Sequence, residues 1–123
     1  MSTVKPVLRI FDYDKTIEFY VDWLGFKVDW IHEFEKGTGP KFIQVSLKDV
    51  MLFLSEHHGD SSPGLHIHIM DFEGLEAYHQ QIAAKKYKYN RPGLQVPFWN
   101  ENAISMTIID PFGNHITFSE VIK

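Results

Sequence analysis

The sequence contains no cysteine. Without thiols the chain cannot form a disulfide, bind zinc through thiolates or use a cysteine nucleophile. It also has no apolar run close to the roughly 20 residues that a membrane-spanning helix needs, and the residues from Met1 to Lys5 lack the apolar stretch of a signal peptide. We therefore expect a cytoplasmic protein with no membrane partner, in which any metal would be held by histidine or carboxylate side chains.

Basic residues are scarce as well. The 123 residues include 12 Lys and Arg against 16 Asp and Glu, which gives a net charge of -4. The only basic cluster, Lys85, Lys86, Lys88 and Arg91, is typical of a solvated helix end. Because nucleic-acid binding requires a concentrated basic face, the composition argues against a nucleic-acid partner. The mild acidic excess instead suits a cationic ligand.

The stretch from Asp110 to Glu120 gives the clearest structural signal. Asp110, Pro111 and Gly113 fit a type I turn, because Pro presets the backbone of the second turn position and Gly eases the exit. Residues 103–109 and 115–121 flank this turn, and the second of these segments alternates polar and apolar side chains. A β-hairpin is predicted, with one face for a core and one polar face.

Two parts of the chain resemble each other. Residues 52–56 read LFLSE and residues 116–120 read ITFSE, while residues 10–12 and 69–71 both place an Asp before a helical pattern. Such self-similarity predicts a repeated structural unit. We expect one domain over residues 1–123, built from units at about 4–56 and 64–121, a length that is ordinary for a single domain.

Each unit is predicted to be βαβββ. In the first unit, strands are expected over 4–11, 26–34, 42–47 and 50–55, with a helix that begins after Asp12 or Asp14 and ends at Leu24. In the second unit, strands are expected over 65–70, 103–109 and 115–121, a helix over 73–86 and a short edge strand over 87–89. Sheets rich in antiparallel pairs with one helix per unit belong to the α+β class.

This repeat, the W-L-G-F of residues 23–26 and the D-P-x-G of residues 110–113 resemble the vicinal oxygen chelate superfamily, which includes glyoxalase I, extradiol dioxygenases and bleomycin-resistance proteins. The resemblance covers nearly the whole chain. It implies paired βαβββ units that form a curved mixed sheet around an enclosed cleft, in a homodimer. It does not choose between enzyme and binding protein, because one fold hosts both.

The metal positions of that superfamily are mostly lost. The resemblance places them at Lys5, Phe53, His66 and Thr117, of which only His66 has a side chain suited to a metal. We therefore expect no catalytic residue, no metal and no cofactor. The chain looks closest to the metal-free bleomycin-resistance proteins, which sequester a cationic aromatic antibiotic without modifying it and exchange their first strands between subunits.

The expected ligand is thus a small molecule of the bleomycin kind. Flat aromatic rings stack on exposed aromatic side chains, and cations pair with carboxylates or ring faces. The predicted ligand-binding residues share an aromatic, acidic or strand-facing polar character: Asp29, Trp30, Phe34, Phe53, His66, His68, Trp99 and Thr117.

An alternative is a metal-dependent enzyme, either a glyoxalase-type lyase or isomerase or a dioxygenase. His66 and His68 lie two positions apart, so on a strand both project to one face and form half of a metal site. Glu120 is the candidate third ligand, although it faces away from Thr117 unless a bulge intervenes. A one-residue slip would instead turn the neighbouring isoleucines of the strand at 65–70 to the cleft, and an interaction module without a ligand also stays open.

Overall fold

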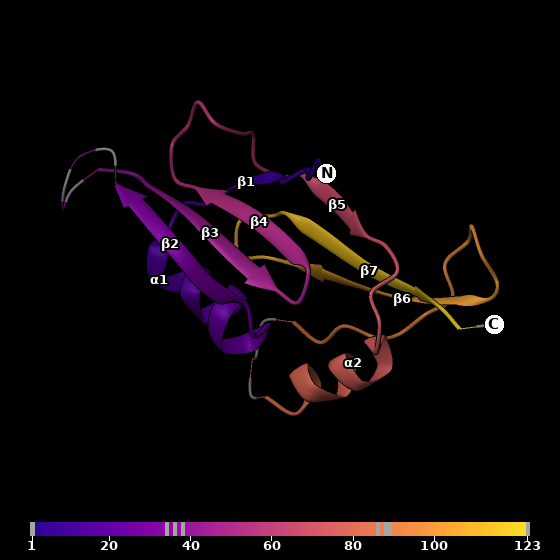
Figure 1. Ribbon diagram of the computed structural model, residues 1–123. Coiled ribbons are helices and arrows are strands. Elements are labelled where there is room, and N and C mark those ends of the chain that lie inside the picture. The colour runs from indigo at the N-terminus through magenta and orange to yellow at the C-terminus, as the bar shows by residue number, and fades with distance from the viewer. Residues whose placement is uncertain are drawn as a thin grey trace. The chain divides into compact units, whose positions relative to one another are not determined.

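The chain builds two β-sheets, and each belongs to its own compact unit. The computed structural model describes residues 2–33, 35, 37, 39–85, 87 and 90–122 (Figure 1). One unit comprises Met1–Leu65 with Pro111–Asn114, and the other comprises His66–Asp110 with His115–Lys123. No helix in these described residues is both long and apolar enough to cross a bilayer.

The first unit holds a four-stranded sheet. Its elements are β1 (Val7–Arg9), α1 (Tyr13–Thr16), η1 (Ile17–Trp23), β2 (Lys27–Glu33), β3 (Lys41–Leu47) and β4 (Val50–Ser55). The strand order is β1-β4-β3-β2, with β1 parallel to β4 and the other pairs antiparallel. All elements predicted for this unit are present, so its βαβββ order is confirmed.

The helical stretch of this unit departs from a regular α-helix. Asp12 caps α1 as predicted, because its side chain accepts a hydrogen bond from the Lys15 N–H at 3.0 Å. From Ile17 onward the chain widens into the π-helical segment η1, which ends before Gly25, a residue with a φ of 85°.

The second unit holds a three-stranded sheet. Its elements are β5 (His66–Ile69), α2 (Leu75–Ala83), β6 (Ala103–Ile109) and β7 (His115–Val121). The order is β5-β7-β6, with β5 parallel and β6 antiparallel to β7. The closing hairpin has the predicted bounds. The first strand of each unit therefore pairs in parallel with its last strand, as the repeat requires.

The predicted edge strand at 87–89 is the main difference. Tyr87 lies outside the strands, while residues 88 and 89 lie outside the described residues. Gln95 lies at the edge of β6 instead and forms an isolated antiparallel bridge with Ser105. The Gln95 N–H donates to the Ser105 carbonyl at 2.9 Å, and the Ser105 N–H donates to the Gln95 carbonyl at 2.7 Å. The α+β class and the mixed sheets are confirmed, whereas the enclosed cleft and the dimer stay predictions.

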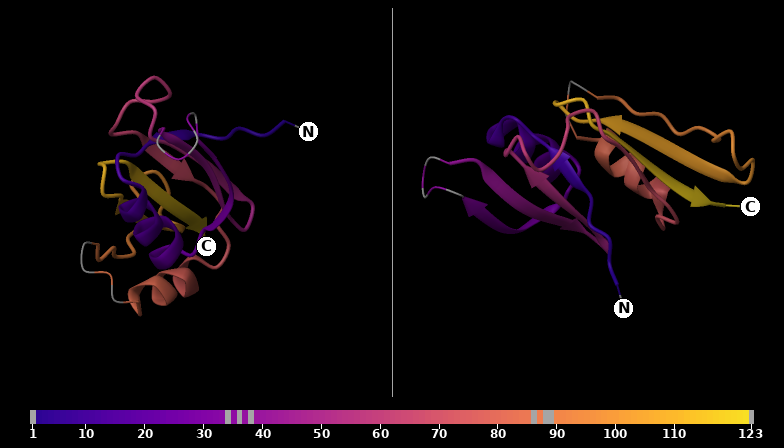
Figure 2. Two further views of the ribbon diagram at one scale, coloured as in Figure 1. Left: turned by 90° about the vertical axis from the view of Figure 1, so that its left-hand side faces the viewer. Right: turned by 90° about the horizontal axis from the view of Figure 1, so that it is seen from above.

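One face of each sheet is buried. In the first unit the inward side chains of β3 and β4, among them Ile43 and Leu54, have no exposed surface. In the second unit α2 lies beside β6 and β7 (Figure 2), and Phe118 packs at 5.0 Å from Phe72 and at 5.6 Å from Tyr78, between ring centroids. The opposite face of each sheet carries residues that the sequence predicts to bind a ligand, among them Phe53 and Thr117.

Candidate functional site

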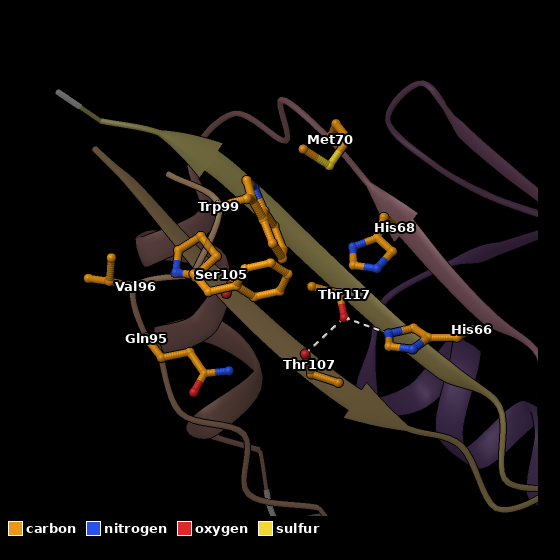
Figure 3. A pocket seen from close by; sticks show the side chains of 11 residues that line it. His66, His68, Met70, Gln95, Val96, Trp99, Ser105, Thr107 and Thr117 are labelled. Carbon is orange, nitrogen blue, oxygen red and sulfur yellow. Dashed lines mark hydrogen bonds between the residues drawn. The ribbon is translucent and has the colours of Figure 1, made fainter. Parts of the chain in front are cut away.

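A pocket of about 700 Å³ opens on the face of the second sheet that α2 does not cover (Figure 3). This volume is in the usual range for a site that binds a drug-sized molecule. Its floor comes from the three strands and its wall from the loop before β6. The lining residues are His66, His68, Met70, Gln95, Val96, Pro97, Phe98, Trp99, Ser105, Thr107 and Thr117.

Two stacked imidazoles form one side of the floor. Strand alternation turns His66, His68 and Met70 to the pocket, which excludes the one-residue slip. The rings of His66 and His68 lie 4.9 Å apart at an interplanar angle of 17°. His115 adds a third ring 5.3 Å from His66. Partial burial, then the charges of His68 and His115, lower the pKa of His66, so its neutral form is favoured.

Hydroxyl groups continue the floor from the histidines toward β6. The Thr117 Oγ1 lies 3.2 Å from the His66 Nε2 and 2.8 Å from the Thr107 Oγ1 (Figure 3). Thr117 is 4% exposed, and the register of the hairpin pairs it with Thr107. Together these groups form a short line of donors and acceptors beneath the pocket.

The wall is aromatic and half open to solvent. Trp99 meets His68 edge to face, with ring centroids 5.6 Å apart at 76°, and Phe98 meets Trp99 at 5.2 Å. Trp99 is 42% exposed and Phe98 is 97% exposed. An exposed aromatic pair beside a polar floor is suited to a flat ring system with hydrogen-bonding groups on its rim.

The first unit has an aromatic surface of its own, formed by Trp30, Phe42 and Phe53, which we name the first-unit aromatic cluster. The rings of Trp30 and Phe42 are stacked at 6.0 Å and 13°, and Phe53 lies 5.0 Å from Phe42. The Lys5 ammonium lies 5.3 Å from the centroid of the Phe53 ring and donates a 2.9 Å hydrogen bond to the Gln44 Oε1. A lysine of the chain itself thus occupies a position that suits a cation.

Asp29 is already bonded within this unit. A register shift between Val28 and Trp30 marks an irregularity in β2 at this residue. Its carboxylate accepts 3.0 Å hydrogen bonds from the Gln44 Nε2 and the Ser46 Oγ, and Lys27 lies 3.6 Å away. The Gln44 hydrogen bond is the largest cause of a lowered Asp29 pKa; burial opposes it, and the Ser46 hydrogen bond and the Lys27 charge add to the lowering.

The predicted site residues therefore fall into two groups. His66, His68, Trp99 and Thr117 line the second-unit pocket. Asp29, Trp30 and Phe53 belong to the face of the first sheet described above. Phe34 lies outside the described residues.

Several lining residues were missed by the sequence reasoning. Ser105 and Thr107 could have been found, because they alternate along β6 opposite the polar positions of β7. Gln95 and Phe98 belong to an irregular loop, for which strand periodicity gives no signal.

Glu120 has a structural role. Its two carboxylate oxygens each accept a 3.0 Å hydrogen bond, one from the Gly74 N–H and one from the Leu75 N–H, at the start of α2. This is the helix side of the sheet, opposite Thr117. In the described part of the chain no three His, Asp or Glu side chains gather in a group that could hold a metal ion. His66 and His68 remain a pair without a carboxylate partner in the pocket lining.

The chain combines a repeated unit with an open pocket on its second sheet, and one such fold can host both binding proteins and enzymes. The sequence matches the family described as "Glyoxalase superfamily protein" over residues 1–123, and the chain belongs to this superfamily. A comparison with curated proteins finds no match.

Solved structures share the fold at low sequence identity. A glyoxalase-related enzyme from Clostridium phytofermentans has a TM-score of 0.72 at 20% identity, covering 99% of this chain and 96% of its own. An antibiotic binding protein from Streptomyces sp. CB03234 has a TM-score of 0.71 at 21% identity, covering 98% and 97%. A bleomycin resistance determinant encoded on the transposon Tn5 has a TM-score of 0.71 at 19% identity, covering 98% of each chain. At these identities the likeness establishes the fold alone.

Proposed function

We propose that this protein is a metal-independent binding protein for flat aromatic small molecules, acting like the bleomycin-resistance proteins by holding a ligand without modifying it. The observation that carries the proposal is the second-unit pocket, where Phe98 and Trp99 stand beside a floor of imidazole and hydroxyl groups. The similarity to an antibiotic binding protein and to a bleomycin resistance determinant supports it.

The chemistry of the floor supports binding over catalysis. The pair of Thr117 and His66 resembles a hydroxyl nucleophile with a base, but a working pair needs an accessible hydroxyl and a third group that orients the imidazole. The Thr117 side chain is buried, and the rings closest to His66 are two further histidines. No carboxylate lines the described pocket to orient His66.

A fluorescence titration of the metal-stripped protein tests this function, with bleomycin as the first ligand and a neutral anthraquinone as the second. Binding should quench tryptophan emission saturably at one ligand per chain. Trp99→Ala should weaken binding about tenfold, because it removes the main stacking surface of the pocket.

Trp30→Ala is the matched control variant, since Trp30 is also 42% exposed but belongs to the first-unit aromatic cluster. If only Trp30→Ala weakens binding, the ligand uses the first-unit cluster and the assignment to the second-unit pocket is wrong. If neither ligand binds, a sequestering function is excluded for these chemical classes.

The second candidate is a metal-dependent enzyme of the same superfamily. The observation in its favour is the parallel stacking of His66 and His68 on one strand face, which leaves both imidazoles open to the pocket. Metal analysis of untagged protein after exposure to nickel, zinc or manganese distinguishes the two functions. About one bound metal per chain, lost in His66→Asn, would favour the enzyme.

We also expect a homodimer that acts in the cytoplasm. In the structure β1 pairs with β4 of its own chain, with Val7 opposite Phe53. Light scattering after size-exclusion chromatography measures the oligomeric state directly, and a monomer at working concentrations would contradict the expected assembly.

A further inference from the structure

The charge of the pocket indicates the charge of its ligand. Among the described residues that line the pocket none is acidic, and the only titratable ones are His66 and His68. The 16 acidic residues of the chain therefore leave this surface without a counter-ion for a cation. A cationic ligand that entered here would lose hydration without gaining a partner of opposite charge.

Asp29, the acidic residue predicted to bind the ligand, belongs to the first unit and is already hydrogen-bonded there. Both oxygens of Asp29 accept hydrogen bonds, from Gln44 and Ser46, and Lys27 lies nearby. The Lys5 ammonium already lies over Phe53. Asp29 and Lys5 thus already have partners within the first unit.

Hydrogen-bond donors in the pocket favour an acceptor. Each imidazole has two ring nitrogens, and only the Nε2 of His66 has a hydrogen-bond partner in the described chain, the Thr117 hydroxyl at 3.2 Å. A ligand that brings negatively charged oxygens would accept hydrogen bonds from the N–H groups of these imidazoles, whose other ring nitrogens have no partner among the described residues.

We propose that the ligand of the second-unit pocket is a planar aromatic molecule that carries an acidic group, such as a carboxylate, sulfonate or phenolate, bound against His66 and His68 while its rings lie on Trp99 and Phe98. This inference rests on the proposed function and specifies its ligand class. It replaces the cationic ligand that the acidic composition and the family resemblance favoured.

The stacked imidazoles should make the affinity for an acidic ligand depend on pH. The His68 and His115 rings lie 4.9 and 5.3 Å from the His66 ring, so the free pocket disfavours a positive charge on His66. No other titratable side chain lines the pocket from β6 or from the loop before it in the described residues. An anion against the N–H edges of the rings stabilises the imidazolium form of His66, so binding should take up a proton and tighten as the pH falls.

Three anthraquinones that differ in one substituent test the inference: the 2-sulfonate, the neutral 2-sulfonamide and the cationic 2-aminomethyl compound. The sulfonate does not titrate in the working range, so any pH dependence belongs to the protein. We expect it to bind about fivefold more tightly than the sulfonamide at about pH 6, and the advantage to shrink by about pH 8. Calorimetry in two buffers of different ionisation enthalpy measures the proton uptake directly.

Variants of His68 separate charge from shape. His68→Asn should remove most of the preference for the sulfonate and reduce the proton uptake, while sulfonamide binding changes little. His68→Lys should keep the preference but lose its pH dependence, because lysine stays charged throughout this range. His58→Asn is the matched control, since His58 is stacked on His57 at 4.9 Å in the first unit and should change nothing.

The outcomes separate this inference from the function on which it rests. If the sulfonamide binds through Trp99 but the sulfonate binds no better, or if the cation binds most tightly, the acidic ligand is wrong and the aromatic binding function stands. If none of the three compounds binds, the proposed function fails as well.

Discussion

Replacing Glu120 by alanine tests whether this residue caps a helix or binds a metal. The helix α2 begins after Gly74, which has a φ of 76° and no side chain to act as a cap. Two N–H groups at this end, from Gly74 and Leu75, instead donate to the Glu120 carboxylate at 3.0 Å. Glu120 therefore supplies from β7 the acceptor that a capping residue normally supplies locally.

The expected cost follows from known capping energies. Loss of a side-chain cap costs about 1 kcal/mol, with a range of about 0.5–2 kcal/mol, and a negative charge at a helix N-terminus contributes within the same range. Because the hydrogen bond from Gly74 is exposed to solvent, we expect Glu120→Ala to lower the free energy of unfolding by about 1 kcal/mol. For a domain of this size that corresponds to a fall in melting temperature of about 3–5 °C. Glu120→Gln keeps one acceptor oxygen and should lose about half as much.

Thermal unfolding by circular dichroism, with and without nickel, zinc or manganese, measures both roles. Glu101→Ala is the control, because Glu101 is an exposed acid in the turn before β6. We expect Glu120→Ala to lower the melting temperature equally in the presence and absence of metal. An unchanged melting temperature without metal, together with loss of a metal-induced increase seen in the natural protein, would refute the capping role and restore Glu120 as a ligand.

Two further predictions concern stability. Phe118 is fully buried against Phe72 and Tyr78, so Phe118→Ala should lower the free energy of unfolding, measured with urea, by about 3–5 kcal/mol. Phe98→Ala is the control at a 97% exposed position and should change this free energy by less than about 0.5 kcal/mol. Equal losses in the two variants would contradict the assigned core. The depressed pKa of Asp29 means that its interactions stabilise the fold above the unfolded value of 3.8 and are lost as the pH falls through the lower folded value. The melting-temperature difference between the natural protein and Asp29→Asn should therefore narrow on acidification to about pH 3, and a constant difference would show that the Asp29 charge has no role.

Strands bounded by strong turn residues could be predicted closely from the sequence. The turn at Lys48 and Asp49 separates β3 from β4 as expected, and the turn from Asp110 to Gly113 separates β6 from β7. In both hairpins the period-2 pattern and the turn residues indicate the same register. Local signals that agree in this way fix a structure without help from distant contacts.

The helical stretch of the first unit could not be predicted in detail. A regular helix would turn Ile17, Tyr20, Val21 and Leu24 to the core. In the π-helical segment Tyr20 and the following Leu24 are buried as expected and Ile17 and Val21 are half-buried, but Phe19 and Trp23 are buried as well. The Phe19 ring lies 4.8 Å from Tyr20 and 5.3 Å from Trp23, between centroids. The reason is tertiary, because a cluster of large rings outweighs the local preference for 3.6 residues per turn.

The site could be predicted in part. Alternation along β5 placed His66 and His68 on one face, and the position of Trp99 between loop residues indicated an exposed ring. The pairing of Asp29 with Gln44 and Ser46 depends on the irregular register between β2 and β3, which no pattern in the sequence reveals. The sequence therefore indicates Asp29 as a source of negative charge but not its partners, and its role in ligand binding stays a prediction.

The internal repeat places nitrogen-bearing side chains at equivalent positions of the two units. Phe53 and Thr117 hold equivalent positions on the last strands of the two units, and their partners in the parallel pairs are Val7 and His68. Two positions before these partners come Lys5, just before β1, and His66, on β5. Lys5 already has the Phe53 ring and the Gln44 amide as partners, whereas His66 opens to a pocket without a carboxylate among its described lining residues. The second-unit pocket is therefore better suited to oxygen anions than to the cations that the net charge of -4 would attract.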